Sequence, residues 1–229
     1  ADLAEAYADG TVRFSIDQNV ICRWVPASAV QGFYDRLDAA GLATPDAGTI
    51  ADVTSCPGAE TCRLAVTQSR GLGRLLIEHL NAHPELVDAV PSGDIKISGC
   101  PNGCGQHHIS GIGFQGSVRK LAGRAVPQYF VLVGGGVTDD AAHFGKVVSK
   151  VPVHRLTDAL DRLIGLYRER REDGESLGAF FRRLPPAVAT DALKDLAELR
   201  AEETVPDDFI DLGESQTFTP EVMDGECAS

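Results

Sequence analysis

Four cysteines, arranged as two pairs, are the residues of this 229-residue chain best suited to chemistry. Cys56 and Cys62 form a C-x5-C pair, and Cys100 and Cys104 form a C-x3-C pair. Four thiolates from two chain segments can converge on one iron–sulfur cluster, with each segment supplying two ligands. Zinc competes for such ligands, but zinc sites usually take more closely spaced pairs, so the first pair fits poorly. The pattern favours an iron–sulfur cluster over zinc or four independent buried thiols.

Proline and glycine residues around the cysteines indicate how the backbone runs there. Pro57 and Pro101 each follow the first cysteine of a pair, and a proline disfavours helix at the residue before it. We therefore expect Cys56 and Cys100 to lie in turns. Glycines near the pairs would let the backbone pass close to a bulky inorganic group and donate N–H groups to its sulfur atoms. These glycines are Gly58, Gly99, Gly103 and Gly105.

Apolar periodicity predicts the elements that must position the two pairs. The end of a helix is expected over 1–9. One or two strands within 11–25 and a helix that ends at Gly41 form a small βα unit at 10–41, whose lone sheet edge needs a cover. Further strands are expected at 94–98, 108–118 and 128–135, and further helices at 60–82, 139–149, 155–171, 175–184 and 188–202. This alternation favours an α/β fold.

Composition and charge exclude several classes of protein. No apolar stretch approaches the length needed to span a bilayer, and residues 1–10 lack the basic-then-apolar order of a secretion signal. The expected location is therefore cytoplasmic, where disulfide frameworks are rare. The formal net charge is −12, and residues 201–229 contain nine acids without Lys or Arg. We expect no membrane or nucleic-acid partner, and a solvated segment at this end of the sequence.

Two segments around the cysteines match a known signature. The segments SCPGAETCRLA (55–65) and ISGCPNGCGQHHI (97–109) together resemble the C-x5-C and C-x3-C signature of siroheme-dependent nitrite/sulfite reductases. The resemblance covers most of residues 10–185. It is carried there by VRFSIDQN (12–19), IGFQG (112–116), YFVLVGGG (129–136) and VPVHRL (151–156).

The resemblance implies two cofactors and a set of residues for them. Cys56, Cys62, Cys100 and Cys104 would bind a 4Fe-4S cluster, and Cys104 would also be the axial ligand of the siroheme iron. A thiolate shared in this way couples the cluster electronically to the haem. Three amide side chains would lie near the macrocycle: Gln18 and Asn19 in a strand, and Asn102 between the last two cysteines.

The activity implied by the resemblance is the six-electron reduction of sulfite to sulfide, or of nitrite to ammonia, with ferredoxin or a flavoprotein as electron donor. We expect sulfite in preference to nitrite. Arg63, Arg70 and Arg74, at helical spacing, would form either a basic stripe for an acidic donor or an ordinary solvated helix face. Two alternatives remain: a 4Fe-4S electron-transfer module without siroheme, and a zinc-stabilised interaction domain.

The resemblance also implies a division of the chain and a missing partner. Residues 1–44 would be part of a ferredoxin-like half-domain, 45–185 a mixed-sheet α/β domain for 4Fe-4S and siroheme, and 186–229 a helical and acidic C-terminal extension. Family members consist of two related halves, of which this chain resembles the second. The basic residues that anchor siroheme and substrate come mainly from the first. We therefore expect a fragment or one part of a split or cleaved enzyme, inactive without the N-terminal half.

Two histidines and two further cysteines also have side chains that could take part in a reaction. His107 or His108 could donate protons, because reducing sulfite or nitrite consumes them. Alternation along the strand expected there would point the two rings to opposite faces. Cys22 lies in an apolar stretch and is expected to be a buried, inert thiol. Cys227 is expected to be a tail thiol whose acidic surroundings disfavour the thiolate.

Overall fold

The computed structural model describes residues 1–220, which divide into two compact units. Unit 1 comprises residues 1–48, and unit 2 starts at Thr49. The three-part division expected from the sequence stays a prediction.

Unit 1 is a small βα arrangement, as its periodicity predicts. Its elements are α1 (Asp2–Tyr7), β1 (Val12–Phe14), β2 (Val20–Cys22), the 3-10 turn η1 (Ala27–Ala29) and α2 (Val30–Ala39). The two strands pair antiparallel, with Arg13 opposite Ile21. Among residues 1–48 only Ala4 is buried. Unit 1 therefore forms secondary structure with almost no core of its own.

The segment Ser15–Asn19 turns the chain between β1 and β2, so the strand expected through this segment is wrong. The hydroxyl oxygen of Ser15 accepts hydrogen bonds from the backbone N–H groups of Asp17 and Asn19, at 3.2 and 3.1 Å. Gln18 has φ of 66°, a left-handed conformation that suits a turn and not a strand. Gln18 and Asn19 are thus loop residues, because local side-chain hydrogen bonds compete here with the ladder.

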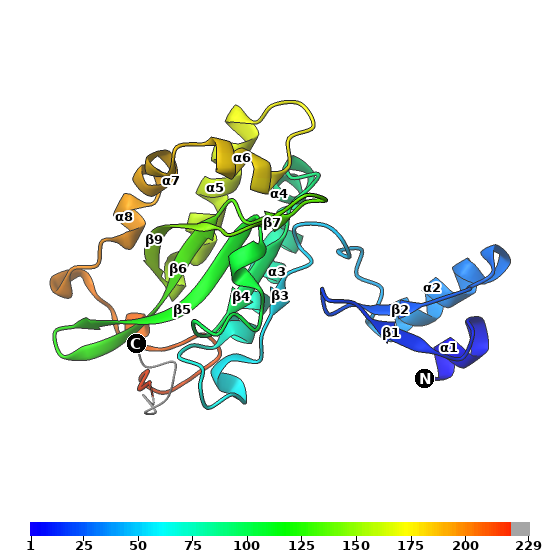
Figure 1. The fold of residues 1–229 in the computed structure, drawn as a ribbon. Coiled ribbons are helices and arrows are strands. Elements are labelled where there is room, and N and C mark those ends of the chain that lie inside the picture. The colour runs from blue at the N-terminus through cyan, green and yellow to red at the C-terminus, as the bar shows by residue number, and fades with distance from the viewer. Residues whose placement is uncertain (221–229) are drawn as a thin grey trace. The chain divides into compact units, whose positions relative to one another are not determined.

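Unit 2 is built on a five-stranded mixed sheet in the order β3-β4-β5-β6-β9 (Figure 1). The strands are β3 (Thr54–Ser55), β4 (Ile95–Ser98), β5 (Ile112–Leu121), β6 (Arg124–Val133) and β9 (Lys146–Pro152). The pairs β3–β4 and β4–β5 are parallel, whereas β5–β6 and β6–β9 are antiparallel. A second, two-stranded sheet joins β7 (Gly136–Val137) to β8 (Ala142–His143). The expected α/β class is confirmed.

Helices bury one face of this sheet. They are α3 (Ser69–Ala82), α4 (Pro84–Ala89), α5 (Leu156–Arg170), α6 (Leu177–Arg183), α7 (Pro186–Ala192) and α8 (Lys194–Ala197). Leu76 of α3 and Leu160 of α5 share one hydrophobic core with Ile97 and Phe114 of the sheet. Leu193, beyond the segment ending at 185, belongs to the same core. Within residues 1–220, no helix is both long and apolar enough to cross a lipid bilayer.

The opposite face of the sheet is covered at its centre by η3 (His107–Ile109), one of several 3-10 turns. A Cβ added at Gly113 of β5 would overlap the carbonyl oxygen of His107, so η3 lies directly on the strand. The other 3-10 turns are η2 (Gly58–Glu60), η4 (Val153–Arg155), η5 (Ala201–Glu203) and η6 (Pro206–Phe209). The chain between β4 and β5 therefore returns across the sheet face.

Three helices expected from the sequence differ in the structure, and the one expected over 188–202 is divided into α7 and α8. The helix expected at 139–149 is wrong: β8 and β9 occupy this region, because β9 completes the hydrogen bonds of β6. The helix expected over 60–82 begins only at Ser69. Residues 56–68 form a loop instead, since Val66 and Thr67 donate their N–H groups to the carbonyl of Gly99 and not to a helix.

Candidate cluster-binding site

The parallel pairing of β3 with β4 brings the two cysteine pairs to the same edge of the sheet. Ser55 lies opposite Ile97, so Cys56 and Cys100 follow the carboxyl ends of neighbouring strands. The N–H of Cys56 donates to the carbonyl of Ile97 at 3.0 Å. The N–H of Gly99 donates to the sulfur of Cys56 at 3.2 Å. Both first cysteines lie outside helices, as the prolines after them predict.

Further hydrogen bonds tie the first cysteine loop, residues 56–68, to the second strand end. The carbonyl of Gly99 accepts the N–H groups of Val66 at 2.8 Å and Thr67 at 3.2 Å. Cys62 follows η2 and donates its N–H to the carbonyl of Gly58 at 2.9 Å. The two cysteine loops thus meet through backbone contacts centred on Gly99.

The four sulfur atoms differ in exposure. Cys56 and Cys100 are buried, with relative exposures of 6% and 5%, whereas Cys62 is half-buried and Cys104 is exposed. Within residues 1–220, no three His, Cys, Asp or Glu side chains are grouped closely enough to hold a metal ion together. The structure therefore joins the backbones of the loops without gathering the sulfur atoms. Their role as ligands stays a prediction.

Close backbone packing explains the glycines beside the cysteines. A Cβ on Gly105 would overlap the carbonyl oxygen of Ile97, and one on Gly99 would lie 2.7 Å from the carbonyl oxygen of Thr67. Gly58 and Gly103 have φ of +64° and +71°, a conformation that favours glycine. Close packing or a left-handed backbone conformation within the chain therefore explains the presence of each of the four glycines.

Lys96 is a site residue that the sequence analysis missed. It is buried in β4, and its ammonium group donates to the side-chain oxygen of Gln106 at 3.1 Å. Asp94 lies 4.0 Å from the same ammonium group. The lysine thereby holds Gln106, which lies two residues after Cys104. The sequence does contain a sign of it, because Lys96 is a charged residue between Ile95 and Ile97 in the expected strand.

His107 and His108 lie in η3 and not in a strand, so the prediction of opposite faces is wrong. Their ring centroids are 3.8 Å apart. His107 is fully buried, and its Nε2 lies within hydrogen-bond distance, 3.2 Å, of the side-chain oxygen of Gln115. Burial lowers the pKa of His107 to about 4, with a further contribution from His108. His107 is therefore a neutral ring near neutral pH.

The remaining predicted residues are spread over both units. Asn102 is exposed between the last two cysteines, and Gln18 is exposed in the turn of unit 1. Asn19 is partly buried beside it. Cys22 is partly exposed in β2, so its predicted burial is wrong, because unit 1 has no core to cover it. Cys227 lies outside the described residues.

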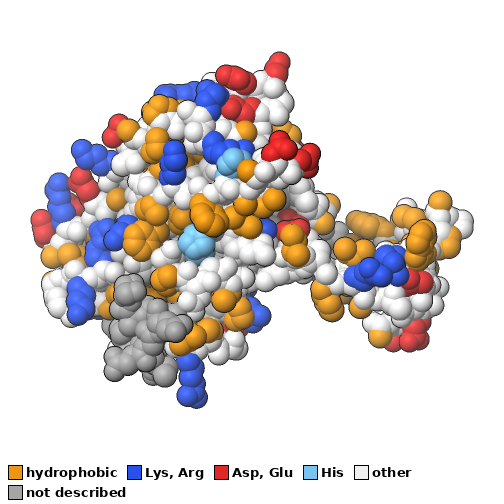
Figure 2. Space-filling model, in the orientation of Figure 1, with side chains coloured by type: hydrophobic (Ala, Val, Ile, Leu, Met, Phe, Trp, Pro, Cys, Tyr) orange, Lys and Arg blue, Asp and Glu red, His pale blue; other side chains and the backbone are white. Residues whose placement is uncertain are grey.

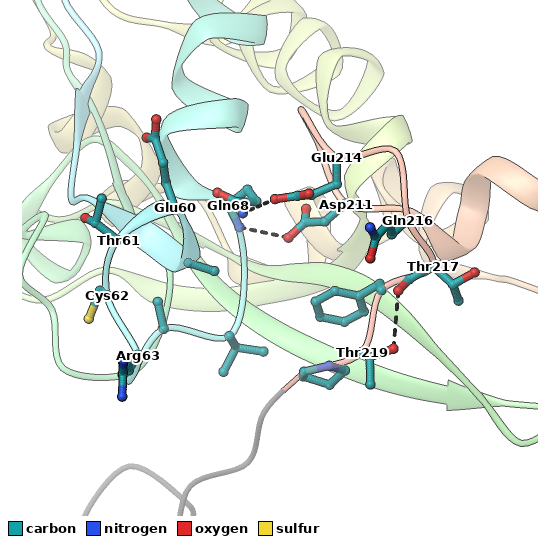
Figure 3. A pocket seen from close by; sticks show the side chains of 15 residues that line it. Glu60, Thr61, Cys62, Arg63, Gln68, Asp211, Glu214, Gln216, Thr217 and Thr219 are labelled. Carbon is teal, nitrogen blue, oxygen red and sulfur yellow. Dashed lines mark hydrogen bonds between the residues drawn. The ribbon is translucent and has the colours of Figure 1, made fainter.

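A pocket of about 520 Å³ adjoins the first cysteine loop. Its walls come from residues 59–68 and from residues 211–220. Figure 3 shows Asp211 and Glu214 pointing toward Gln68 within it. Glu60 adds a third carboxylate, and Arg63 is the cationic side chain among the lining residues. This charge pattern does not suit a macrocycle that carries many carboxylates.

Models of known protein families match most of the chain. Residues 47–185 match the nitrite and sulphite reductase 4Fe-4S domain, and residues 1–40 match the nitrite/sulfite reductase ferredoxin-like half domain. The chain belongs to the nitrite and sulfite reductase family. The resemblance on the cysteine signature is thereby confirmed, and membership supports the 4Fe-4S cluster and siroheme as cofactors at the level of the family.

Individual relatives of this reductase-family chain include enzymes for both substrates. The chain is 31% identical over 206 residues to the assimilatory ferredoxin-dependent nitrite reductase of Haloferax mediterranei, covering 86% of this chain and 33% of that protein. It is 30% identical over 185 residues to sulfite reductase (ferredoxin) 1 of Mycolicibacterium paratuberculosis, covering 79% and 33%. The chain spans about a third of the length of these curated relatives.

Solved structures agree with the family assignment. The NirA protein of Mycobacterium tuberculosis matches with a TM-score of 0.68 and 25% identity, over 82% of this chain and 35% of that one. Dissimilatory sulfite reductase I matches with a TM-score of 0.66 over 98% of this chain and 68% of that one. At 12% identity, the second match shows the fold alone.

Replacing Gly105 by Ala should destabilise unit 2 by roughly 2–3 kcal/mol, because the added methyl group overlaps the carbonyl of Ile97. The matched control is Gly165→Ala in the middle of α5, where a Cβ meets no atom within 4 Å. That control should stabilise by up to about 1 kcal/mol through helix propensity. Urea unfolding of the purified chain measures both changes. Equal stability of the two variants would contradict the close packing of this loop.

His107 should make unit 2 less stable in mild acid. The unfolded chain takes up a proton near pH 6.5 that the folded chain accepts only near pH 4, so the free energy of unfolding falls as the pH drops through this interval. His107→Gln should reduce this fall, whereas the exposed control His83→Gln should not. Urea unfolding of the metal-free chain at pH 7 and at about pH 5 tests the difference. If the free energy of unfolding of His107→Gln fell as much between these pH values as that of the unchanged chain, His107 would not be the cause of the fall.

Proposed function

We propose that this chain is the cluster-bearing part of a reductase that uses a 4Fe-4S cluster and siroheme to reduce sulfite or nitrite. The observation that carries the proposal is the junction of the two cysteine loops at Gly99, on adjacent ends of parallel strands. The family model that matches residues 47–185 is that of a 4Fe-4S domain, and four thiolates from two such segments can hold one cluster. By itself the chain is inactive in this proposal, because it spans about a third of its relatives.

Cys56, Cys62, Cys100 and Cys104 are the proposed ligands of the cluster. The N–H of Gly99 already donates to the sulfur of Cys56, and such hydrogen bonds stabilise a thiolate and tune a bound cluster. Cys56 and Cys100 are held on the ends of strands, whereas Cys62 and Cys104 lie on the loops that follow. In this proposal the loop cysteines complete the ligand set around the two fixed ones.

Cys104 is the proposed ligand that the cluster shares with siroheme. It is exposed, so its sulfur is accessible to a group that this chain does not enclose. When bound, siroheme supplies the iron at which an oxyanion is reduced by successive electrons. We propose that Asn102 and, from unit 1, Gln18 and Asn19 lie near the macrocycle, where their amides can orient its polar edges.

The N-terminal half of the enzyme is the proposed partner for siroheme and for unit 1. The pocket beside the first cysteine loop is rich in carboxylates, and we propose that the cations for siroheme and for an anionic substrate come from the N-terminal half. Unit 1 exposes large apolar side chains over its surface (Figure 2). Phe14, Ile16 and Trp24 are 76%, 75% and 78% exposed. A unit this small, with one buried residue, needs such a partner to bury its apolar surface.

The proposed electron donor is ferredoxin or a flavoprotein. The two relatives described above are named as ferredoxin-dependent enzymes. Arg70 and Arg74 are exposed on α3, and Arg63 is exposed in the loop before it, so they do not form the single helical stripe expected. Arg70 also pairs with Glu60 at 3.4 Å. They remain candidate contacts for an acidic donor, beside the first cysteine loop.

Anaerobic reconstitution with ferrous iron and sulfide tests the cluster. The chain should take up about four iron atoms and show the broad visible absorption of a 4Fe-4S cluster. Changing Cys56, Cys62, Cys100 or Cys104 singly to Ser should lower the iron content and its stability to chelator, because each removes one thiolate. The control Cys22→Ser, in unit 1, should behave as the unchanged chain.

Two results would contradict this assignment. The first is a colourless, zinc-containing protein after anaerobic purification, which would favour the interaction domain. The second is a normal cluster in all four variants.

In the complete enzyme, Cys104→Ser should also abolish siroheme binding, measured by the Soret band. A cluster without siroheme in the complete, unchanged enzyme would instead favour the electron-transfer module.

Trp24 provides a direct test of the proposed partner, because it is the single tryptophan of the chain and is exposed. Its fluorescence should have the long-wavelength maximum of a solvated indole and should shift to shorter wavelength when the N-terminal portion of the full-length protein is added. Phe14→Ser with Ile16→Ser should weaken this shift. The control Val205→Ser, an exposed apolar residue of unit 2, should not. An unchanged emission maximum on addition would contradict the interaction.

A further inference from the structure

The segment 206–218, hereafter the C-terminal strap, is folded against unit 2, although a solvated segment was expected here. Phe209 and Asp211 in it are 3% exposed. The strap closes on itself, because Ile210 forms a β-bridge with Thr217 and the N–H of Phe218 donates to the carbonyl of Phe209 at 2.6 Å. It lies beyond the segment that matches the 4Fe-4S domain, which ends at residue 185.

The strap caps the helix that follows the first cysteine loop. One carboxylate oxygen of Asp211 accepts the backbone N–H of Gln68 at 2.8 Å (Figure 3). Gln68 is the N-cap residue of α3, and its own side chain makes no cap hydrogen bond. The Gln68 side chain instead donates to Glu214 of the strap at 2.6 Å. A carboxylate from the strap therefore supplies the acceptor that a helix start requires, where the helix dipole also favours negative charge.

Contacts around Asp211 hold the strap in this place from several sides. A Cβ on Gly71, in the first turn of α3, would lie 2.6 Å from the carbonyl oxygen of Leu212. On another side, Nε2 of His154 lies 3.0 Å from the carbonyl oxygen of Ile210. The guanidinium of Arg124 lies 3.5 Å from the centre of the Phe209 ring. The strap thus joins α3 to η4 and β6.

The residues beside the cap contact both cysteine loops. Ser69 donates its hydroxyl to the carbonyl of Cys56 at 2.8 Å, and the same hydroxyl oxygen lies 3.2 Å from the Cys56 sulfur. Thr67, on the other side of Gln68, donates its N–H to the carbonyl of Gly99. Fixing Gln68 therefore fixes the two residues that connect the loop to Cys56 and Gly99.

We propose that Asp211 is a positioning residue: by capping Gln68, it holds the first cysteine loop in the arrangement that retains the cluster. This inference rests on the proposed function. Asp211 accepts hydrogen bonds from the N–H groups of Gln68 and Leu212, and its effect on Cys56 passes through Gln68 and Ser69. Burial raises the pKa of Asp211, and its hydrogen bonds with the Gln68 and Leu212 N–H groups oppose that rise. A side-chain oxygen is therefore needed at position 211 to accept the N–H groups of Gln68 and Leu212.

Hydrogen exchange of the full, metal-free chain tests the cap. In Asp211→Ala, amides in 62–72 should exchange about tenfold faster, because the loop opens without its acceptor, while those in β5 and β6 keep their rates. Asp211→Asn should restore most of the protection, since its amide oxygen can still accept the Gln68 N–H. The control Asp207→Ala removes an exposed carboxylate of the same strap and should change nothing.

Cluster retention is the second measurement. After reconstitution, Asp211→Ala should lose its visible absorption to a chelator several-fold faster than the unchanged chain, and Asp211→Asn should resemble the unchanged chain. Unaltered exchange in 62–72, an equal increase across β5 and β6, or release at the unchanged rate would each overturn the inference. If the unchanged chain binds no cluster, the proposed function fails, and the exchange rates still decide whether Asp211 fixes the loop.

Discussion

The parallel pairing of β3 with β4 is the constraint on which the rest of unit 2 depends. Parallel neighbours place their carboxyl ends at one edge, and this places Cys56 beside Gly99. Such pairing needs a crossover, and α3 and α4 provide it between the two strands. The apolar side of α3 then packs on the sheet. The geometry of the cysteine loops and the main core of unit 2 therefore form together, and neither can change alone.

Hydrogen bonds from both backbone and side-chain groups hold the two cysteine loops in this structure. Gly99 donates to the Cys56 sulfur and accepts two N–H groups from the opposite loop. Lys96 secures the second loop from the sheet side through Gln106. Because these groups lie at a largely buried edge, each unmade hydrogen bond would cost more than at the surface. The loops are thus held near each other before any cluster contributes its own binding energy.

The two units differ in how they bury apolar surface. Unit 2 has a continuous core that extends to Leu193, and the C-terminal strap adds Phe209 against Arg124. Unit 1 forms a hairpin and helices but buries only Ala4 among residues 1–48. Secondary structure there follows local periodicity, whereas so small a buried apolar surface contributes little to its stability. Both units nevertheless match models of one reductase family, over residues 47–185 and 1–40.

The sequence by itself determined the family, the α/β class, the strand at 94–98 and the helix at 155–171, because cysteine spacing and apolar periodicity are local signals. Tertiary structure decided the rest. Residues 146–152 became a strand because β6 had an open edge, and residues 60–68 stayed a loop because Gly99 took their N–H groups. The rings of His107 and His108 lie close together, at a tilt, because both residues belong to η3, which crosses the sheet face. The partnership of Gln68 with Asp211 joins residues far apart in sequence, and no local pattern encodes a contact that only the folded chain creates.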